Sequence, residues 1–399
     1  MRGTTIRKQF IQQLLKITAL LITLTGCTTT QVVTSSSTPA MQASEYIPQD
    51  ELLDIGIQPL DPGIPDAIED IEKFLIVPDV RRAESSYIAY QLKDTLELTG
   101  NWGAVRVTPE TSNSVDLYVR GRILASDGEI LRVAITVSDA AGKTWYSREY
   151  EDTASKFSYA KPVEDPFQDI YNQISDDLLQ ARQLLSRTDV INIKTVANLR
   201  FARDLAPDAF EGYLTADRKD RLAVAQLPAE NDSMMRRVNR IKEQEYLFVD
   251  TLDDYYSRFH REMRPSYDEW RQATYEEAIR LREVQRQARN RLIGGALLIA
   301  AGVAAGGESS TWAGDAAAAG AVVGGIGAVK SGFERRKEAE IHAESLRELS
   351  QSLGTEITPY VLDIEGRTIE LTGTAAEQYV EWRRILRDIY AEETTLPAN

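Results

Sequence analysis

The pattern of hydrophobic and polar residues divides the chain near residue 160. Before that point, short apolar or alternating stretches predict β-strands at residues 73–80, 104–107, 115–126, 129–139 and 144–150. Helical spacing from Ala83 to Leu98, followed by Gly100 as a C-cap residue, predicts one helix between the first two strands. Asp127-Gly128 predicts a tight hairpin between the third and fourth strands. We therefore expect one helix over one face of an antiparallel or mixed sheet.

After residue 160 the pattern is that of helices. An amphipathic helix is predicted at residues 167–185, and residues 196–214 resemble one helix pair of a tetratricopeptide unit. No second copy follows at the expected period, so we expect two packed helices and no repeat array. Residues 232–291 predict long charged helices interrupted at Pro265, which either pack in a bundle or project as a coiled coil.

The C-terminal segment returns briefly to alternation. Residues 356–374 predict a β-hairpin that turns at Glu365-Gly366, and residues 375–390 predict an amphipathic helix that packs on the body or docks a partner. The expected fold class is therefore α+β. A small α/β domain of strand, helix, strand and three-stranded meander is followed by a mostly helical body with a glycine-rich hydrophobic hairpin.

Two glycine-rich stretches without any charge, residues 292–307 and 316–329, form this hairpin. On a helix, small residues recur every four positions: Gly302 and Gly306 in the first stretch, and Ala316, Gly320, Gly324 and Ala328 in the second. Such stripes let helix backbones pack closely in lipid. At 1.5 Å per residue each stretch reaches only about 21 to 24 Å, less than the roughly 30 Å of a hydrocarbon core. The hairpin is thus membrane-inserted and oligomeric, close-packed inside a soluble bundle, or a flexible loop.

The N-terminus has the order of a secretory signal peptide. Four positive and no acidic residues accompany an apolar run at residues 17–24, and Gly26 precedes Cys27, the only cysteine. The run is too short to span a bilayer as a helix. The four residues Leu-Thr-Gly-Cys that end at Cys27 resemble the lipobox of bacterial lipoproteins. This resemblance implies cleavage before Cys27 and its acylation, whereas the alternative is a free cysteine behind an uncleaved anchor.

The lipobox resemblance also implies a location. Thr28, where an Asp would signal retention, favours the outer membrane by analogy with enterobacterial lipoproteins. Acyl chains contribute about 0.8 kcal/mol per buried CH₂, so several of them hold a protein firmly. Residues 28–70 are rich in Ser, Thr, Pro and acidic residues. We expect them to form an extended tether or a strap across a neighbouring subunit.

Composition limits the possible functions. The net charge is −15, and removal of the signal peptide would change it to −19, which argues against a nucleic-acid-binding surface. With Cys27 acylated, no cysteine remains for a disulfide. His260 has no His or Cys near it in the sequence, and we expect a hydrogen-bonded surface residue. No metal or cofactor site is expected.

Three stretches in the first half of the chain carry a family resemblance: LELTGNWGAVRV, VDLYVRGRI and LRVAITVSDAAGKTWYSREY. They make residues 73–151 similar to the N-terminal domain of TolB and to related periplasmic lipoprotein domains of the curli-channel and Pel-secretion type. The resemblance implies a protein-interaction domain of cell-envelope assemblies, often arranged in rings. It implies no catalytic role.

The chain contains no nucleophile-elbow, P-loop or HExxH motif and no Cys/His cluster. We therefore expect a non-enzymatic outer-membrane lipoprotein that faces the periplasm, scaffolds an envelope assembly with other envelope proteins, and forms homo-oligomers. The alternative is a lipid-anchored hydrolase of envelope polymers. The expected segments are a signal peptide (1–26), a lipidated acidic tether (27–70), an α/β domain (71–155), a helical domain (160–291), the glycine-rich hairpin (292–330) and a C-terminal part (331–399).

Overall fold

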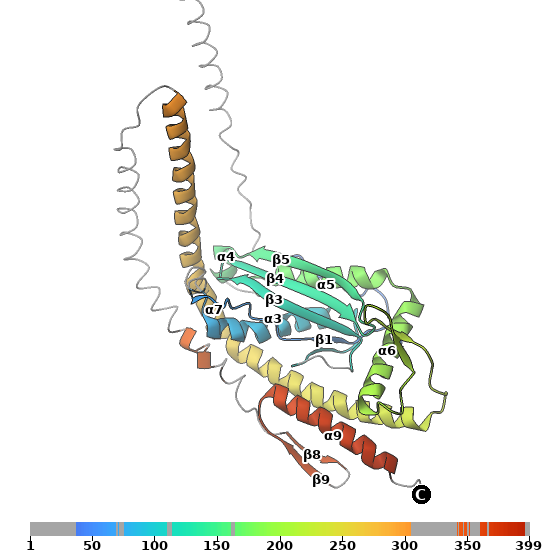
Figure 1. The fold of residues 1–399 in the computed structure, drawn as a ribbon. Coiled ribbons are helices and arrows are strands. Elements are labelled where there is room, and N and C mark those ends of the chain that lie inside the picture. Colours follow the sequence, from blue (N-terminus) through green and yellow to red (C-terminus); the bar gives the residue numbers. More distant parts are fainter. Residues whose placement is uncertain are drawn as a thin grey trace, which may run out of the picture. The chain divides into compact units, whose positions relative to one another are not determined.

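The computed structural model describes residues 37–68, 71, 76–109, 114–160, 164–304, 341, 343–345, 347–348, 351, 360–364 and 367–395. Residues 36–399 group into one compact unit. Its main sheet contains β1 (Ile55–Ile57), β2 (Val105–Val107), β3 (Leu117–Ser126), β4 (Ile130–Asp139) and β5 (Thr144–Thr153). The strand order is β2-β1-β3-β4-β5, with β1 parallel to both neighbours and the other pairs antiparallel. The sheet is thus mixed, and the fold class is α+β, as expected (Figure 1).

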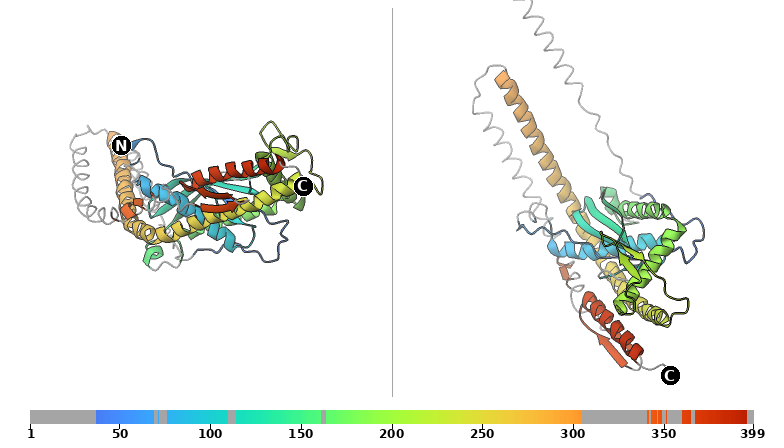
Figure 2. Two further views of the ribbon diagram at one scale, coloured as in Figure 1. Left: turned by 90° about the horizontal axis from the view of Figure 1, so that it is seen from below. Right: turned by 45° about the vertical axis from the view of Figure 1, so that its right-hand side comes forward.

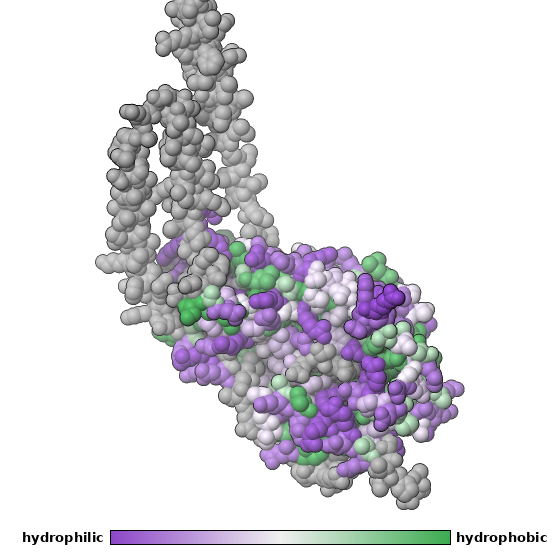
Figure 3. Space-filling view, in the orientation of Figure 1, coloured by the Kyte–Doolittle hydropathy of each residue, from purple (hydrophilic) through white to green (hydrophobic). Residues whose placement is uncertain are grey.

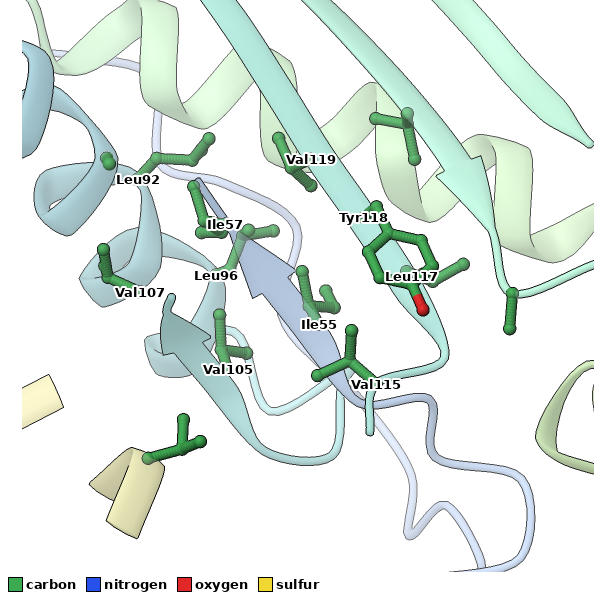
Figure 4. Packing of buried hydrophobic residues seen from close by; sticks show 14 of the residues in the cluster. Ile55, Ile57, Leu92, Leu96, Val105, Val107, Val115, Leu117, Tyr118 and Val119 are labelled. Carbon is green, nitrogen blue, oxygen red and sulfur yellow. The ribbon is translucent and has the colours of Figure 1, made fainter. Parts of the chain in front are cut away.

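The central strand β1 comes from a part of the chain that we expected to be an extended tether. Ile55 and Ile57 are fully buried, and Figure 4 shows them packed near Leu92 and Leu96 of helix α3 (Pro78–Leu98). The tether prediction is therefore wrong for this stretch. Three residues are too few to show an alternating pattern among neighbouring acids and prolines. A parallel strand with a neighbour on each side is nevertheless buried on both faces.

Helix α3 replaces the end of the strand predicted at residues 73–80. It begins at Pro78, where the missing N–H costs little because N–H groups of the first turn have no partner within the helix. Residues 76 and 77 precede the helix outside any strand, so the strand prediction is wrong for 76–80. Residues 72–75 lie outside the described residues. Gly100 follows the helix with a φ of +68°, which confirms the predicted C-cap glycine.

The two faces of the main sheet differ in what covers them. Helices α3 and α5 (Gln168–Gln183) lie on one face (Figure 1). Every second residue of β4 is buried on that face: Leu131, Val133, Ile135 and Val137. The other face carries the exposed residues Arg120, Arg122 and Arg132. Figure 3 shows this side of the molecule as largely hydrophilic.

Two short helical predictions after the sheet had different outcomes. The amphipathic helix predicted at 167–185 is confirmed as α5, which follows the short helix α4 (Lys156–Ala160). After α6 (Arg187–Leu205), the second helix of the predicted pair does not form. β6 (Leu214–Ala216) and β7 (Leu222–Val224) form a hairpin instead. Asp217 accepts the N–H groups of Lys219 and Arg221 in its turn, which is turn chemistry that the helical pattern obscured.

One helix, α7 (Ser233–Ala304), replaces the interrupted helices predicted around Pro265. Its backbone stays helical through Pro265, whose ring is exposed. An internal proline costs about 3 kcal/mol. However, Met263, Tyr267 and Trp270 on either side of it are buried against α3, and such side chains each contribute roughly 1.5–3 kcal/mol when buried. The packing of this helix face therefore outweighs the effect of the proline.

The glycine-rich hairpin is described only in part. The first stretch is helical as far as Ala304, at the end of α7, and residues 305–340 lie outside the described residues. Among the helices that the structure describes, none combines the length and the apolar composition that a membrane span requires. The hairpin as a whole stays a prediction.

The predicted C-terminal hairpin and helix are confirmed, whereas the predicted turn residues Glu365 and Gly366 lie outside the described residues. β8 (Tyr360–Ile364) and β9 (Arg367–Leu371) form an antiparallel hairpin, and α9 (Ala375–Thr395) follows it. Figure 2 shows α9 alongside the first half of α7. Trp382 is fully buried there, with its ring centroid 5.2 Å from that of Phe248 in α7. α9 thus packs on the body of its own chain.

Candidate functional site

Most site residues predicted from the sequence lie outside the described residues. They are Gly26 and Cys27 of the lipobox, and Gly306, Ala316, Gly320, Gly324 and Ala328 of the glycine-rich stripes. Gly302 lies near the end of α7 and has the helical backbone that its stripe requires. The described residues show how the body joins the chain that leads to these segments.

Residues 37–52, here called the N-terminal strap, are hydrogen-bonded along the body. The N–H and the hydroxyl of Ser37 donate to Glu164 at 2.6 and 2.7 Å. The N–H of Thr38 donates to Asp169 in the first turn of α5 at 2.7 Å. Hydrogen bonds to carboxylates are stronger than those to neutral acceptors. Acidic residues at the start of α5 therefore hold the start of the strap.

The other end of the strap is held by the end of α5 and the start of α6. Arg187 donates to the Asp50 carboxylate at 2.6 Å, and Arg182 donates to the carbonyl of Glu51 at 3.3 Å. The strap then leads directly into β1. It lies on its own chain, so both the extended tether and the strap across a neighbouring subunit were wrong predictions for these residues.

At one end of the sheet, α4, the β3–β4 turn and the facing part of α7 meet; we call this region the α4 end (Figure 1). Gly128 in the turn has a φ of +82°, and a Cβ at this position would clash with the backbone carbonyl of Arg271. Only glycine meets both conditions without strain. Arg282 of α7 forms ion pairs with Asp127 and Glu129 of the turn. The turn is therefore packed and paired against α7.

Arg271 is fully buried at the α4 end, where Asp165 balances its charge. Its terminal nitrogens donate to the Asp165 carboxylate at 3.2 and 3.0 Å, and both side chains are at most 2% exposed. The guanidinium also lies 4.1 Å from the ring centroid of Tyr267. Burial, the largest single effect, would raise the pKa of Asp165. The charge and hydrogen bonds of Arg271, together with hydrogen bonds from Phe167 and Tyr87, outweigh it and hold this pKa below its usual value. The pair is therefore ionised at neutral pH.

The strap and α7 are fastened to two consecutive residues of the connection between α4 and α5. Glu164 binds Ser37, and Asp165 binds Arg271. The backbone N–H of Phe167 also donates to Asp165 at 3.0 Å, which orients the carboxylate. This connection is thus the junction between the N-terminal strap, the long helix and the sheet.

Two fully buried carboxyl groups with raised pKa values hold elements together. Glu84 of α3 accepts hydrogen bonds from Ser126 at 2.7 Å and from Tyr267 at 2.8 Å. Glu245 of α7 accepts one from Tyr379 of α9 at 2.9 Å. Burial is the main cause of the raised pKa of both carboxyl groups, which are 0% exposed. A shifted carboxyl pKa can mark a catalytic acid, but these two groups face other elements of the body instead of solvent.

His260 is buried, contrary to the expected surface position, although the expected hydrogen bond is present. Its Nε2 lies 2.9 Å from Oε1 of Gln91, and its ring stacks on Tyr87 with the centroids 4.3 Å apart. Burial lowers the pKa of His260 to about 4, while the nearby Asp165 opposes this shift. A neutral His260 therefore packs between α7 and α3. The surface position was predicted wrongly because the charged sequence around a single histidine does not show which face of the helix it occupies.

The sequence did not predict a role for the junction residues Glu164, Asp165 and Arg271. The one signal is weak: Arg271 follows Tyr267 by four positions and so shares a helix face with it. Within the part of the chain that the structure describes, no group of three or more His, Cys, Asp or Glu residues could hold a metal ion. No family model, curated protein or solved structure matches the chain.

We expect Arg271→Met to lower the free energy of unfolding by about 3–5 kcal/mol, because it leaves the buried Asp165 carboxylate without its counter-charge. Arg384→Met is the control, since Arg384 is exposed on α9 and its ion pairs lie on the surface. The Arg384→Met variant should lose less than about 1 kcal/mol of its free energy of unfolding. Urea unfolding followed by circular dichroism measures both. Equally small losses would show that the buried pair does not hold α7.

We expect the contribution of His260 to the stability of the fold to fall as the pH falls from 6.5 towards 4. In that window the unfolded chain binds a proton at residue 260 that the folded chain, with a pKa of about 4, does not bind. The loss should be about 2 to 3 kcal/mol. The variant His260→Gln lacks this contribution but keeps the other titrating groups. As the pH falls through this range, the free energy of unfolding of the variant should therefore rise relative to that of the wild type. Parallel pH profiles for both proteins would contradict the expectation.

Proposed function

We propose that the protein is a lipid-anchored scaffold of an outer-membrane assembly, attached through Cys27 on the periplasmic face. The observation that carries this proposal is the N-terminal strap. Only ten residues after Cys27, the chain is already bound to the body at Ser37. Ten extended residues span at most about 36 Å. A lipid on Cys27 would therefore hold the body close to the membrane.

The polar surface of the sheet supports a binding role. In the described residues, β5 is one of the two edge strands of the main sheet, and it is ten residues long, whereas the other edge strand, β2, has three residues. The exposed residues of β5 include Arg148, Glu149 and Glu151. Charges on an edge strand disfavour indiscriminate pairing with other strands. Contacts at this edge would therefore depend on charge complementarity, as a scaffold with defined neighbours requires. The resemblance of residues 73–151 to envelope-assembly domains points in the same direction.

We further propose that the protein forms homo-oligomers through the small-residue stripes of the glycine-rich hairpin. The helical backbone of α7 continues to Ala304 and includes Gly302. This continuity supports the helical spacing on which the stripes depend. Close approach of helix backbones at Gly and Ala would join copies of the chain within the membrane.

We expect Cys27→Ser to abolish incorporation of a fatty-acid analogue and to leave the signal peptide attached, because the lipobox resemblance makes Cys27 the acylated residue. Thr30→Ser, a change of similar size three positions later, should leave both processes as they are in the wild type. Metabolic labelling and mass spectrometry of the purified chains measure the two outcomes. Normal labelling of the Cys27→Ser chain would rule out the anchor.

We expect the double variant Gly320→Leu, Gly324→Leu to break oligomers, because the added side chains separate the helix backbones. The control, Ala318→Leu with Val322→Leu, adds bulk on the opposite side of the same helix and should leave them intact. Light scattering in detergent gives the particle mass. If the hairpin instead packs inside a soluble bundle, the double variant should destabilise the body by about 1–3 kcal/mol per site with no change in mass.

A further inference from the structure

The two segments that we propose to reach the membrane both join the body at the α4 end. The strap starts beside it, because Ser37 is bonded to Glu164 in the connection between α4 and α5. α7 passes the same end, because Arg282 is paired with the β3–β4 turn. The uncharged glycine-rich stretch begins ten residues beyond Arg282, at residue 292.

Chain geometry limits how far this end of the body can lie from a bilayer that holds Cys27 and the glycine-rich stretch. The ten residues between Cys27 and Ser37 span at most about 36 Å, and ten helical residues of α7 span about 15 Å. From the α4 end, the 16 residues of α5 lead away over about 24 Å, and Leu184 follows the far end of that helix. Leu184 is thus well separated from both attachments.

The β6–β7 hairpin marks the end of the sheet opposite to α4. The N–H of Leu222 in β7 donates to the carbonyl of Ala141 in the β4–β5 turn at 2.8 Å. That turn and the β3–β4 turn lie at opposite ends of β4, which is ten residues long and so spans about 33 Å. The body therefore has two distinct ends, and both membrane-directed segments join only one of them.

The surface of the α4 end carries a residue pair suited to a lipid interface. Phe157 of α4 is 59% exposed, and Nζ of Lys156 lies 5.0 Å from the centroid of its ring. At such an interface an aromatic ring can enter the headgroup layer while the ammonium stays hydrated. The nearby Asp127 and Glu129 are paired with Arg282, which reduces their repulsion from anionic lipids. This chemistry fits a phospholipid surface.

We propose that the α4 end faces the bilayer and that the β6–β7 end points away from it, towards periplasmic partners. The proposal rests on the acylation of Cys27 and on the membrane insertion of the glycine-rich stretch, both proposed above. It adds an orientation: the strap and α7 fix which surface of the body the membrane covers. Phe157 then lies on the lipid side, whereas Leu184, which is 87% exposed, lies on the periplasmic side.

Energy transfer to the membrane surface tests this orientation. Because the only native cysteine carries the acyl chains, Phe157→Cys or Leu184→Cys introduces one reactive thiol into the full-length lipidated protein. Each thiol receives the same donor fluorophore. The proteins are then reconstituted in vesicles of phosphatidylethanolamine and phosphatidylglycerol with acceptor-labelled headgroups. We expect several-fold more transfer from position 157 than from position 184. Equal transfer, or more from position 184, would overturn the proposal.

Failure of the lipid anchor would look different from failure of the orientation. Without acylation, mass spectrometry would show a chain that carries no acyl groups, and the fluorophore would also label Cys27. This result overturns both proposals. Acylated, vesicle-bound protein with position 184 nearer the surface overturns the orientation alone. Lys156→Cys provides a second near label if Phe157→Cys disturbs α4, and thermal unfolding checks that each variant is folded.

Discussion

The buried ion pair of Arg271 and Asp165 is the interaction on which the arrangement of the described elements depends. Taking either charge out of water alone would cost several kcal/mol, and only close, well-oriented pairing compensates for it. Both side chains are at most 2% exposed. α7 can therefore pack stably on the connection between α4 and α5 only in the one position along its axis that pairs these two residues. That position places Tyr267 beside Glu84 of α3. It also places Arg282 at the β3–β4 turn.

The same connection ties the N-terminus to the long helix. Glu164 binds the strap, and the next residue, Asp165, binds α7. A displacement of Ser37 would therefore be felt directly by the residue that holds α7. The strap is fixed again by Arg187 before it enters the central strand β1. A membrane attachment at Cys27 would therefore act on the most deeply buried strand of the sheet.

Buried polar groups take the place of covalent crosslinks in this body. With a single cysteine, the chain can form no internal disulfide to join helices of different parts. Glu245 with Tyr379 joins α7 to α9, and His260 with Gln91 joins α7 to α3. Their shifted pKa values follow from burial between elements. Packing between elements therefore accounts for these two shifts.

The sequence by itself determined the elements whose stabilising contacts are local: the meander around Asp127-Gly128, the helix that ends before Gly100, α5, and the C-terminal hairpin and helix. Turns, caps and periodicity involve residues only a few positions apart, so their pattern is visible in the chain. Only the tertiary structure decided β1, the continuity of α7 through Pro265 and the burial of Arg271 and His260. Each of these is stabilised by partners far away in the sequence, and their contact energy outweighs the local preference that the pattern records.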